Sequence, residues 1–403
     1  MGKDPNFIGQ PILSQILSLI DKREIDLLAK KHSSDRYTKK FTTHSHLVTM
    51  LYCILHRCTS LREVTTGMQA CYTKLNHIGM TYCPRRSTLS DANRRRSSEV
   101  FQEIYMTLYS KLGPRLSDSH KSSPIKSKLY IADSTTISLF KAILKTGGRK
   151  PSDGRRKGGM KVHALIKADH DVPCLVKMTA ASEHDVKFIK GLQLPKGSIV
   201  TFDRGYVDLK QYDLWTQQEI TWVTRFKTGV NYNVVDEFSL TEKQKKAGVI
   251  SDDIITLGTK SRYRTQTDAR LIVFYDPVQD KIFSFITNNF LFEPQVIAQI
   301  YKYRWQIELL FKRIKQNFPL KHFLGDNENA LKVQVWCVLI ADLLLKYIKS
   351  KLKKKWSYAN LTSMVRLHLM SYFKLIQFLN NPDKSLINAP NKTKAQLDLF
   401  SSA

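Results

Sequence analysis

Four side chains suited to holding an anion, with or without a metal ion, lie close together in residues 301–315. This segment, YKYRWQIELLFKRIK, has no Pro or Gly and follows QVIAQI, so the sequence predicts a helix. At about 100° per residue, Tyr301, Arg304, Glu308 and Lys315 fall within about 60° of one another. A second, apolar face carries Ile307, Leu310 and Ile314, with Tyr303 alongside. The alternative is a solvated face on which Arg304 and Glu308 form an i,i+4 pair.

Two aspartates end apolar runs that are predicted to be strands. Asp133 ends LYIAD and Asp203 ends SIVTFD. Phosphodiester cleavage can use two hard cations about 3.5–4 Å apart, which serve the attacking and the leaving oxygen. Magnesium prefers carboxylate oxygens and keeps several waters, so two or three carboxylates suffice. A single aspartate at a strand end is more often a turn former, but together we predict Asp133, Asp203 and Glu308 as catalytic residues and ligands of two Mg²⁺ ions, with Mn²⁺ as an alternative.

The order and spacing of these motifs resemble the IS-four type of DDE insertion-sequence transposases. The pattern Tyr-x2-Arg-x3-Glu-x6-Lys is similar to their YREK signature, YIADSTTISLF to their first-aspartate strand, and SIVTFDRGYVD to their second. The resemblance implies cut-and-paste DNA transposition, commonly through a hairpin at the transposon end. It also implies an α/β fold whose RNase H-like catalytic core is interrupted by a β-rich insertion, with Tyr301, Arg304 and Lys315 on transposon-end phosphates.

The charge of the chain favours a polyanionic partner. It has 64 Lys and Arg against 35 Asp and Glu, a formal net charge of +29, and self-repulsion of this size is tolerable when nucleic acid compensates it. We expect double-stranded DNA with terminal inverted repeats and target DNA as partners, a homodimer on DNA, and no membrane. Six cysteines without a CxxC pair indicate free thiols. The expected location is the bacterial cytoplasm, in association with the nucleoid.

Changes in periodicity along the chain predict its domain organisation. Helical patterns fill the first hundred residues, strand-like runs begin at LYIAD, and helices return after Pro294. The 105 positions from Asp203 to Glu308 exceed what a short crossover needs, which matches the insertion that the resemblance implies. The predicted parts are an all-helical DNA-binding domain (1–120), the first part of the core (126–228), the β-rich insertion (229–290), the second part of the core (291–355), and a C-terminal helix with a tail (356–403).

Two basic clusters are further candidate DNA contacts. Thr88 and Asp91 resemble a capping box that opens a helix, and arginines 94–96 would lie in the first turns of that helix. The Gly-rich basic loop from Lys145 to Lys161 suits a DNA backbone, because Gly permits close approach and the cations neutralise phosphates. For both clusters the alternative is a basic segment without contacts. The predicted DNA-binding residues here are Arg85, Arg86, Arg94, Arg95, Arg155, Arg156 and Lys157.

Several weaker candidate residues have two possible interpretations each. His163, two residues after Lys161, could approach the metal site or be a partly exposed strand histidine, and Asp185 in SEHD could be only a helix start. Tyr206 could touch DNA or the β-rich insertion, and Trp305 could stack on a base or pack. The alternative function is a catalytically inactive DNA-binding protein derived from a transposase, which the presence of all three carboxylates disfavours. A plain nuclease would not need the Tyr301–Lys315 face.

Overall fold

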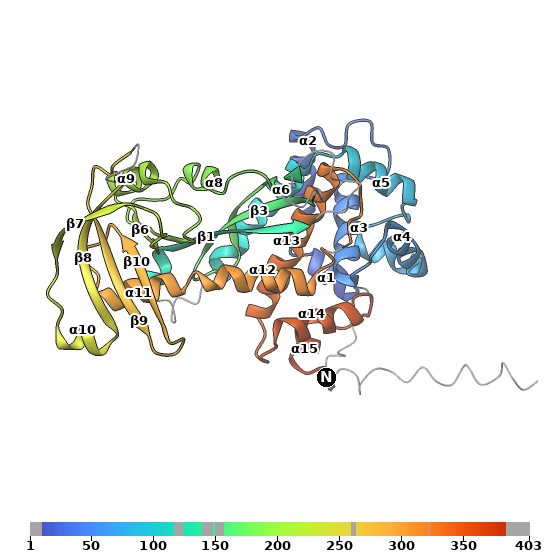
Figure 1. Cartoon of the computed structure of the whole chain (residues 1–403). Coiled ribbons are helices and arrows are strands. Elements are labelled where there is room, and N and C mark those ends of the chain that lie inside the picture. Colours follow the sequence, from blue (N-terminus) through green and yellow to red (C-terminus); the bar gives the residue numbers. More distant parts are fainter. Residues whose placement is uncertain are drawn as a thin grey trace, which may run out of the picture. The chain divides into compact units, whose positions relative to one another are not determined.

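The computed structural model describes residues 10–116, 124–138, 148–149, 157–258, 263–320 and 322–383. Within the chain, two units form (Figure 1): unit 1 combines Met1–Leu108 with Lys315–Ala403, and unit 2 is Tyr109–Ile314. The divisions fall inside helix α6 (Ser98–Leu112) and helix α12 (Trp305–Asn317). The predicted tail from residue 384 onward lies outside the described residues.

Two apolar helices form the centre of unit 1. Helix α3 (Thr43–His56) is buried along most of its length and packs against α13 (Glu328–Ser350), whose VQVWCVLIADLLL run is buried. Side chains cap both helices, because Thr42 accepts from the Ser45 N–H and Asn327 from the Ala330 N–H. The other helices are α1 (Ile12–Leu17), α2 (Lys22–Lys31), α4 (Leu61–Ala70), the 3₁₀ helix η1 (Tyr72–Ile78), α5 (Arg86–Arg95), α14 (Tyr358–Leu367) and α15 (Leu375–Asn380).

The helical pattern over residues 10–30 forms two helices, α1 and α2, and the side chain of Asp21 caps the second by accepting from the Arg23 N–H. The predicted helix start at Thr88 was wrong. Helix α5 begins at Arg86, so Thr88 lies inside it and caps nothing, and Arg94 and Arg95 end this helix rather than open one. Among the described residues, no helix is long and apolar enough to cross a membrane.

One mixed sheet organises unit 2. Its described strands lie in the order β2-β3-β1-β5-β6-β10-β9-β8-β7, and β4 pairs with β3. Strands β1, β5 and β6 are parallel, whereas the other pairings are antiparallel. The bounds are β1 (Leu129–Ser138), β2 (Gly148–Arg149), β3 (Lys157–Lys167), β4 (Pro173–Ala180), β5 (Ile199–Phe202), β6 (Thr221–Arg225), β7 (Tyr232–Glu237), β8 (Val249–Leu257), β9 (Ala269–Asp276) and β10 (Lys281–Thr287).

Helices cover this sheet and complete a mixed α/β unit, which confirms the predicted class. The core cluster joins strand residues such as Ala132 and Phe202 to Phe188 of α8 (Val186–Lys190) and Trp215 of α9 (Leu209–Gln217). The strand that begins at LYIAD is continuous through Ser138, because β1 pairs with β3 along this length. The remaining helical elements are η2 (Gly113–Leu116), α7 (Pro124–Lys128), α10 (Glu242–Lys246), α11 (Pro294–Lys302) and α12.

Candidate active site

The two predicted aspartates lie at neighbouring positions of two parallel strands: Asp133 is inside β1, and Asp203 directly follows β5. The β1–β5 register pairs Ala132 with Phe202, so Asp133 and Asp203 are the next residues on adjacent strands. The carboxyl ends of parallel strands are the usual place for a site in an open α/β sheet. The apolar runs that precede both residues are fully buried and fix the strands in place. The sequence prediction of a strand end was right for Asp203 and wrong for Asp133, because β1 continues through Ser138 in its pairing with β3.

Local hydrogen bonds orient both carboxylates. Asp133 Oδ1 accepts from the backbone N–H of Ser134 at 2.7 Å, and Asp203 Oδ1 accepts from the backbone N–H of Gly205 at 2.9 Å. The backbone N–H of Tyr206 donates to the Asp203 carbonyl at 3.0 Å and closes a turn. Each aspartate thus holds the backbone N–H of a residue that follows it as well as presenting a second carboxylate oxygen.

The predicted signature helix is interrupted. Helix α11 ends at Lys302 and α12 begins at Trp305, with a turn at Tyr303 and Arg304. The Arg304 N–H donates to the Tyr301 carbonyl at 3.0 Å, an i→i−3 bond of the 3₁₀ type, and Tyr303 has φ −62° and ψ −22°. The expectation of one continuous helix was therefore wrong at this point. The predicted apolar face of α12 is buried, at Ile307, Leu310 and Ile314.

Arg304 connects the strand and the helix. Its Nη1 lies 3.2 Å from Asp133 Oδ2 and its Nη2 lies 2.6 Å from Glu308 Oε1. The local pair with Glu308 that the sequence allowed is present, and a contact across 171 positions to Asp133 adds to it. The guanidinium also lies over the ring of Tyr301, with 5.5 Å from its carbon to the ring centroid. Tyr301, Arg304, Glu308 and Asp133 therefore form one group.

The electrostatics of Asp133 place the three carboxylates near one another. Burial raises the pKa of Asp133 to about 6, against the opposing effects of the Ser134 N–H and Arg304, and the charges of Asp203 and Glu308 raise this pKa further. Like charges within a few ångströms disfavour ionisation in this way. A raised carboxylate pKa beside a partner of opposite charge is typical of functional sites.

The three carboxylates have the chemistry of a magnesium site but are not arranged as a finished one. Carboxylate oxygens are the ligands that hard divalent cations prefer. A bound cation would favour the ionised form of Asp133, which burial chiefly, and the charges of Asp203 and Glu308 in addition, disfavour. Within the described part of the chain, no group of three or more Asp, Glu, His or Cys residues is placed to hold a metal ion. The cation that joins Asp133 to Glu308 is the guanidinium of Arg304.

Comparison with known proteins places this arrangement in a family. The profile of the family described as a transposase DDE domain matches residues 124–344, which include all three carboxylates. The chain belongs to the DDE transposases. The profile of a domain of unknown function, DUF4372, matches residues 8–81. The chain is accordingly an enzyme that cleaves DNA in transposition.

Relatives that are named as transposases agree with this assignment. A Sinorhizobium fredii protein named as transposase y4zB is 32% identical over 65% of this chain and 71% of its own length. A Geobacillus stearothermophilus protein named as a transposase of the element IS5377 is 25% identical over 84% of this chain and 84% of its own length. A Synechocystis protein named as a transposase of the element IS4SA is 25% identical over 72% of this chain and 78% of its own length. A solved piggyBac transposase synaptic complex with hairpin DNA covers 97% of this chain and 87% of its own at 12% identity, and its TM-score of 0.42 is too low to establish a shared fold.

The transposase exposes four of the predicted DNA contacts on helix α5. Arg85 precedes the helix, Arg86 opens it, and Arg94 and Arg95 end it, with Arg95 paired to Asp91 at 2.8 Å. Their exposure is compatible with DNA binding but does not test it. Lys315 is likewise exposed, near the end of α12 in unit 1.

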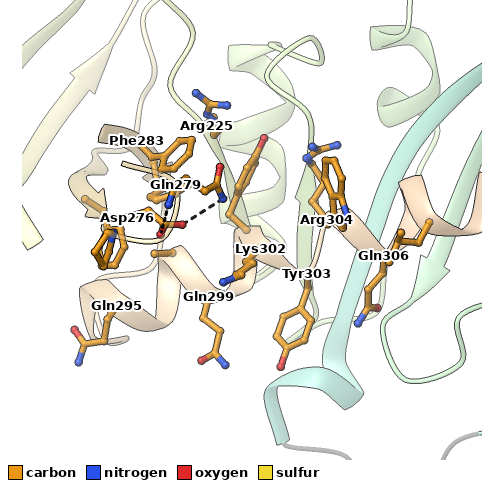
Figure 2. Close-up of a pocket in the computed structure, with 17 residues that line it drawn as sticks. Arg225, Asp276, Gln279, Phe283, Gln295, Gln299, Lys302, Tyr303, Arg304 and Gln306 are labelled. Carbon is orange, nitrogen blue, oxygen red and sulfur yellow. Dashed lines mark hydrogen bonds between the residues drawn. The ribbon is translucent and has the colours of Figure 1, made fainter. Parts of the chain in front are cut away.

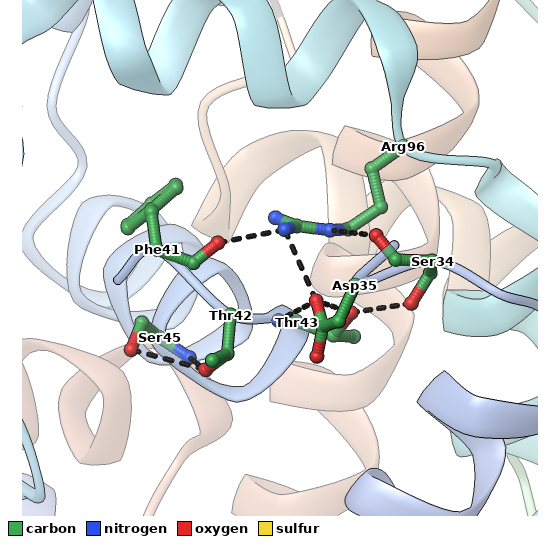
Figure 3. A network of polar contacts seen from close by, with 7 residues as sticks. All are labelled: Ser34, Asp35, Phe41, Thr42, Thr43, Ser45 and Arg96. Carbon is green, nitrogen blue, oxygen red and sulfur yellow. Dashed lines mark hydrogen bonds and ion pairs between the residues drawn. The ribbon is translucent and has the colours of Figure 1, made fainter. Parts of the chain in front are cut away.

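Arg96, grouped with these arginines in the sequence, has a structural position instead. It is buried and donates to the carbonyls of Ser34 and Phe41 and to the carboxylate of Asp35 (Figure 3). Asp35 in turn accepts from the backbone N–H and the hydroxyl of Thr43 at the start of α3. The expectation that Arg96 belongs to an exposed basic helix was wrong, because its partners come from a segment 55 to 62 positions away that local sequence does not reveal.

The predicted basic loop is largely outside the described residues. Arg155 and Arg156 lie there, and Lys157 is the first residue of β3, paired in register with Arg149 of β2. Two other expectations of the transposase sequence are corrected. His163 is 1% exposed rather than partly exposed, and Tyr206 is 2% exposed, packed in the core cluster rather than facing DNA.

A cavity of about 1130 Å³ adjoins Arg304 in unit 2 (Figure 2). It is lined by residues of β9, β10, α11 and the turn before α12, and its wall combines aromatic rings with three cations. The guanidinium of Arg225 lies 4.8 Å from the ring centroid of Phe283, and Trp305 is 58% exposed. Sequence reasoning missed Arg225, which no motif distinguishes. The principal lining residues are Arg225, Phe283, Tyr301, Lys302, Arg304 and Trp305.

Proposed function

We propose that this DDE transposase is of the IS-four type and that Asp133, Asp203 and Glu308 act together in cutting and joining DNA strands at the transposon ends. The observation that carries the proposal is the arrangement of the three carboxylates. Asp133 and Asp203 lie at neighbouring positions of adjacent parallel strands, and Glu308 is joined to Asp133 through Arg304.

The carboxylates would hold divalent ions, two Mg²⁺ in the proposed mechanism, with Mn²⁺ as a substitute. Such ions supply an activated water and stabilise the leaving oxygen. The residues of the chain supply position and charge. Strand β1 fixes Asp133, strand β5 fixes Asp203, and α12 presents Glu308 on its first turn. Burial of Asp133, whose side chain is 16% exposed, limits the water that competes at this point.

Arg304 and Tyr301 are the proposed contacts to the phosphate beside the scissile bond. A guanidinium has five donors in a planar fork, and the two ion pairs of Arg304 leave part of that fork for a phosphate. The neighbouring cavity suits a nucleotide, because aromatic faces can stack a base while Arg225 and Lys302 neutralise phosphate charge. Lys315 is proposed as a further phosphate contact from the same helix.

The domain assignment of the sequence remains part of this proposal. We assign residues 126–228 and 291–355 to an RNase H-like core and residues 229–290, which contain β7 to β10, to an insertion. Residues 1–120 would bind DNA, with residues 356–403 as a C-terminal part. The exposed arginines of α5 and the net charge of +29 favour DNA as the partner. Because two transposon ends must be joined, we expect a homodimer on DNA.

Cleavage and binding measured on the same DNA test this function. The substrate is a linear duplex that carries the inverted repeats flanking the gene, incubated with the full chain and Mg²⁺ or Mn²⁺. We expect Asp133→Asn, Asp203→Asn and Glu308→Gln each to abolish cleavage and to leave end binding in place. EDTA should have the same effect on the wild type. Normal cleavage by any one variant would remove that residue from the site, and a wild type that binds without cleaving would be a DNA-binding protein derived from a transposase.

A further inference from the structure

Ser134, the residue after Asp133, links the candidate active site to a charged group on the other side of β1. Successive side chains of a strand point to opposite faces, so Asp133 reaches Arg304 whereas Ser134 reaches Asp185, directly before α8. The Ser134 hydroxyl donates to Asp185 Oδ1 at 3.0 Å, and the Ser134 N–H donates to Asp133 Oδ1 at 2.7 Å. Ser134 therefore donates two hydrogen bonds, one from its hydroxyl to Asp185 and one from its backbone N–H to Asp133.

Strand β3 supplies the other partners of Asp185. The β1–β3 register sets His163 opposite Ser134 and Lys161 opposite Thr136. Lys161 Nζ lies 3.0 Å from Asp185 Oδ1 and also donates to the Glu183 carbonyl at 3.3 Å, and His163 Nδ1 lies 3.7 Å from the same carboxylate oxygen. Three side chains thus converge on a single oxygen.

A helix-capping role does not account for this carboxylate. Asp185 occupies the N-cap position of α8, but its side chain makes no capping hydrogen bond. The side chains of Lys161 and Asp185 are 15% and 32% exposed. A partly buried ion pair often stabilises a fold no more than apolar residues would, because desolvation offsets the attraction. Stability alone is therefore a weak reason for this group, whereas orientation of a neighbouring residue is a sufficient one.

We infer that Asp185, Lys161 and Ser134 form a positioning group that fixes the carboxylate of Asp133 for strand cleavage, an inference that rests on the proposed role of Asp133. Asp185 orients the Ser134 hydroxyl and so the part of β1 that carries Asp133. The Ser134 N–H holds Asp133 Oδ1, which leaves Oδ2 directed to α12, where Arg304 now contacts it. Lys161 supplies the charge that keeps Asp185 in place. Partners of this kind behind a metal-binding carboxylate typically change activity about 10- to 100-fold.

Two substitutions at Ser134 and one at Asp185 test this group in the full-length protein. Ser134→Ala removes the hydroxyl, Ser134→Thr keeps it, and Asp185→Asn keeps an acceptor but loses the ion pair with Lys161. We expect Ser134→Ala and Asp185→Asn to lower kcat for end cleavage about 10- to 100-fold, with the KM for DNA and end binding unchanged. Both should need more Mg²⁺ for half-maximal cleavage, and Ser134→Thr should restore most of the rate. Lys187→Gln is the matched control, since this exposed lysine of α8 pairs only at 3.8 Å with Glu183.

The outcomes separate this inference from the proposed function. Wild-type kcat and Mg²⁺ dependence in both Ser134→Ala and Asp185→Asn would overturn it. A fall in kcat that Ser134→Thr does not rescue, or that follows a lowered melting temperature and weakened end binding, would also overturn it and make the group structural. Failure of the wild type to cleave, or cleavage by Asp133→Asn, would instead refute the proposed function, and the positioning role would fall with it.

Discussion

Neutralising Asp133 should stabilise the metal-free protein while it removes catalysis. Burial raises the pKa of this carboxyl from its ordinary value of 3.8 to about 6. The folded state therefore binds the proton more tightly than the unfolded state, so stability falls as the pH rises from about 4 through 6. The full cost above that range is about 3 kcal/mol, from a shift of about two pKa units at 1.36 kcal/mol each. The side chain is 16% exposed, so solvent screening reduces this figure only modestly.

Comparing the free energies of unfolding of Asp133→Asn and the wild type at two pH values isolates the cost of ionising Asp133. By linkage, ionisation of Asp133 lowers the free energy of unfolding of the wild type by about 1.6 kcal/mol at pH 5 and by about 3 kcal/mol at pH 8. The stability advantage of Asp133→Asn should therefore grow by about 1.4 kcal/mol between pH 5 and pH 8. Groups that the substitution leaves unchanged titrate alike in both proteins, so their contributions cancel in the difference between the two free energies of unfolding.

Urea denaturation in EDTA, followed by tryptophan fluorescence, measures this advantage. Trp215 and Trp222 are buried in the same unit as Asp133 and report its unfolding. Asp236→Asn, a change at an exposed carboxylate on the edge strand β7, is the control for loss of charge alone. An advantage that stays constant or shrinks toward pH 8 would refute the reasoning, because it would mean that Asp133 is no harder to ionise in the folded protein than in the unfolded chain.

Other perturbations test the ion pairs and the charge. Arg304→Ala should lower cleavage and raise the affinity for Mn²⁺ measured by calorimetry, because Asp133 and Glu308 lose their internal cation; unchanged affinity would contradict the bridging role. Arg270→Met should cost about 3–5 kcal/mol in urea denaturation, since it leaves Asp252 buried without its cation, and Arg270→Met with Asp252→Leu should recover much of this loss. The affinity for end DNA should fall steeply with salt, because many phosphates are contacted, and a flat dependence would argue against the DNA role of the +29 charge.

Sequence reasoning succeeded where the chemistry of a residue is set by its own segment. The apolar run before Asp203 determines that this residue follows a buried strand, and the largely apolar run of α13 determines that this helix is buried. The mixed α/β class follows from the same alternation of strand-like and helical segments. In each case the decisive information lies within about ten residues of the feature predicted.

It failed where a residue takes its partner from a distant segment. Nothing around Arg96 distinguishes it from Arg94 and Arg95, yet it is buried against Asp35. Ser134 looks like an ordinary strand residue until Asp185 is brought to it by the path of the chain through β3 and β4. Tertiary contacts of this kind override local pattern, because burying a polar group requires a specific partner that periodicity does not encode.

The turn before α12 explains how a face predicted for a continuous helix is kept in an interrupted one. The break precedes Arg304, so Arg304 and Glu308 stay one helical turn apart and keep their 2.6 Å pair. Residues i and i+3 of a 3₁₀ turn are eclipsed, so the bond from the Arg304 N–H to the Tyr301 carbonyl brings these two side chains to the same side. The guanidinium can then lie over the Tyr301 ring and still reach Asp133. Interrupting the helix therefore tightens the group of phenol, guanidinium and carboxylates instead of dispersing it.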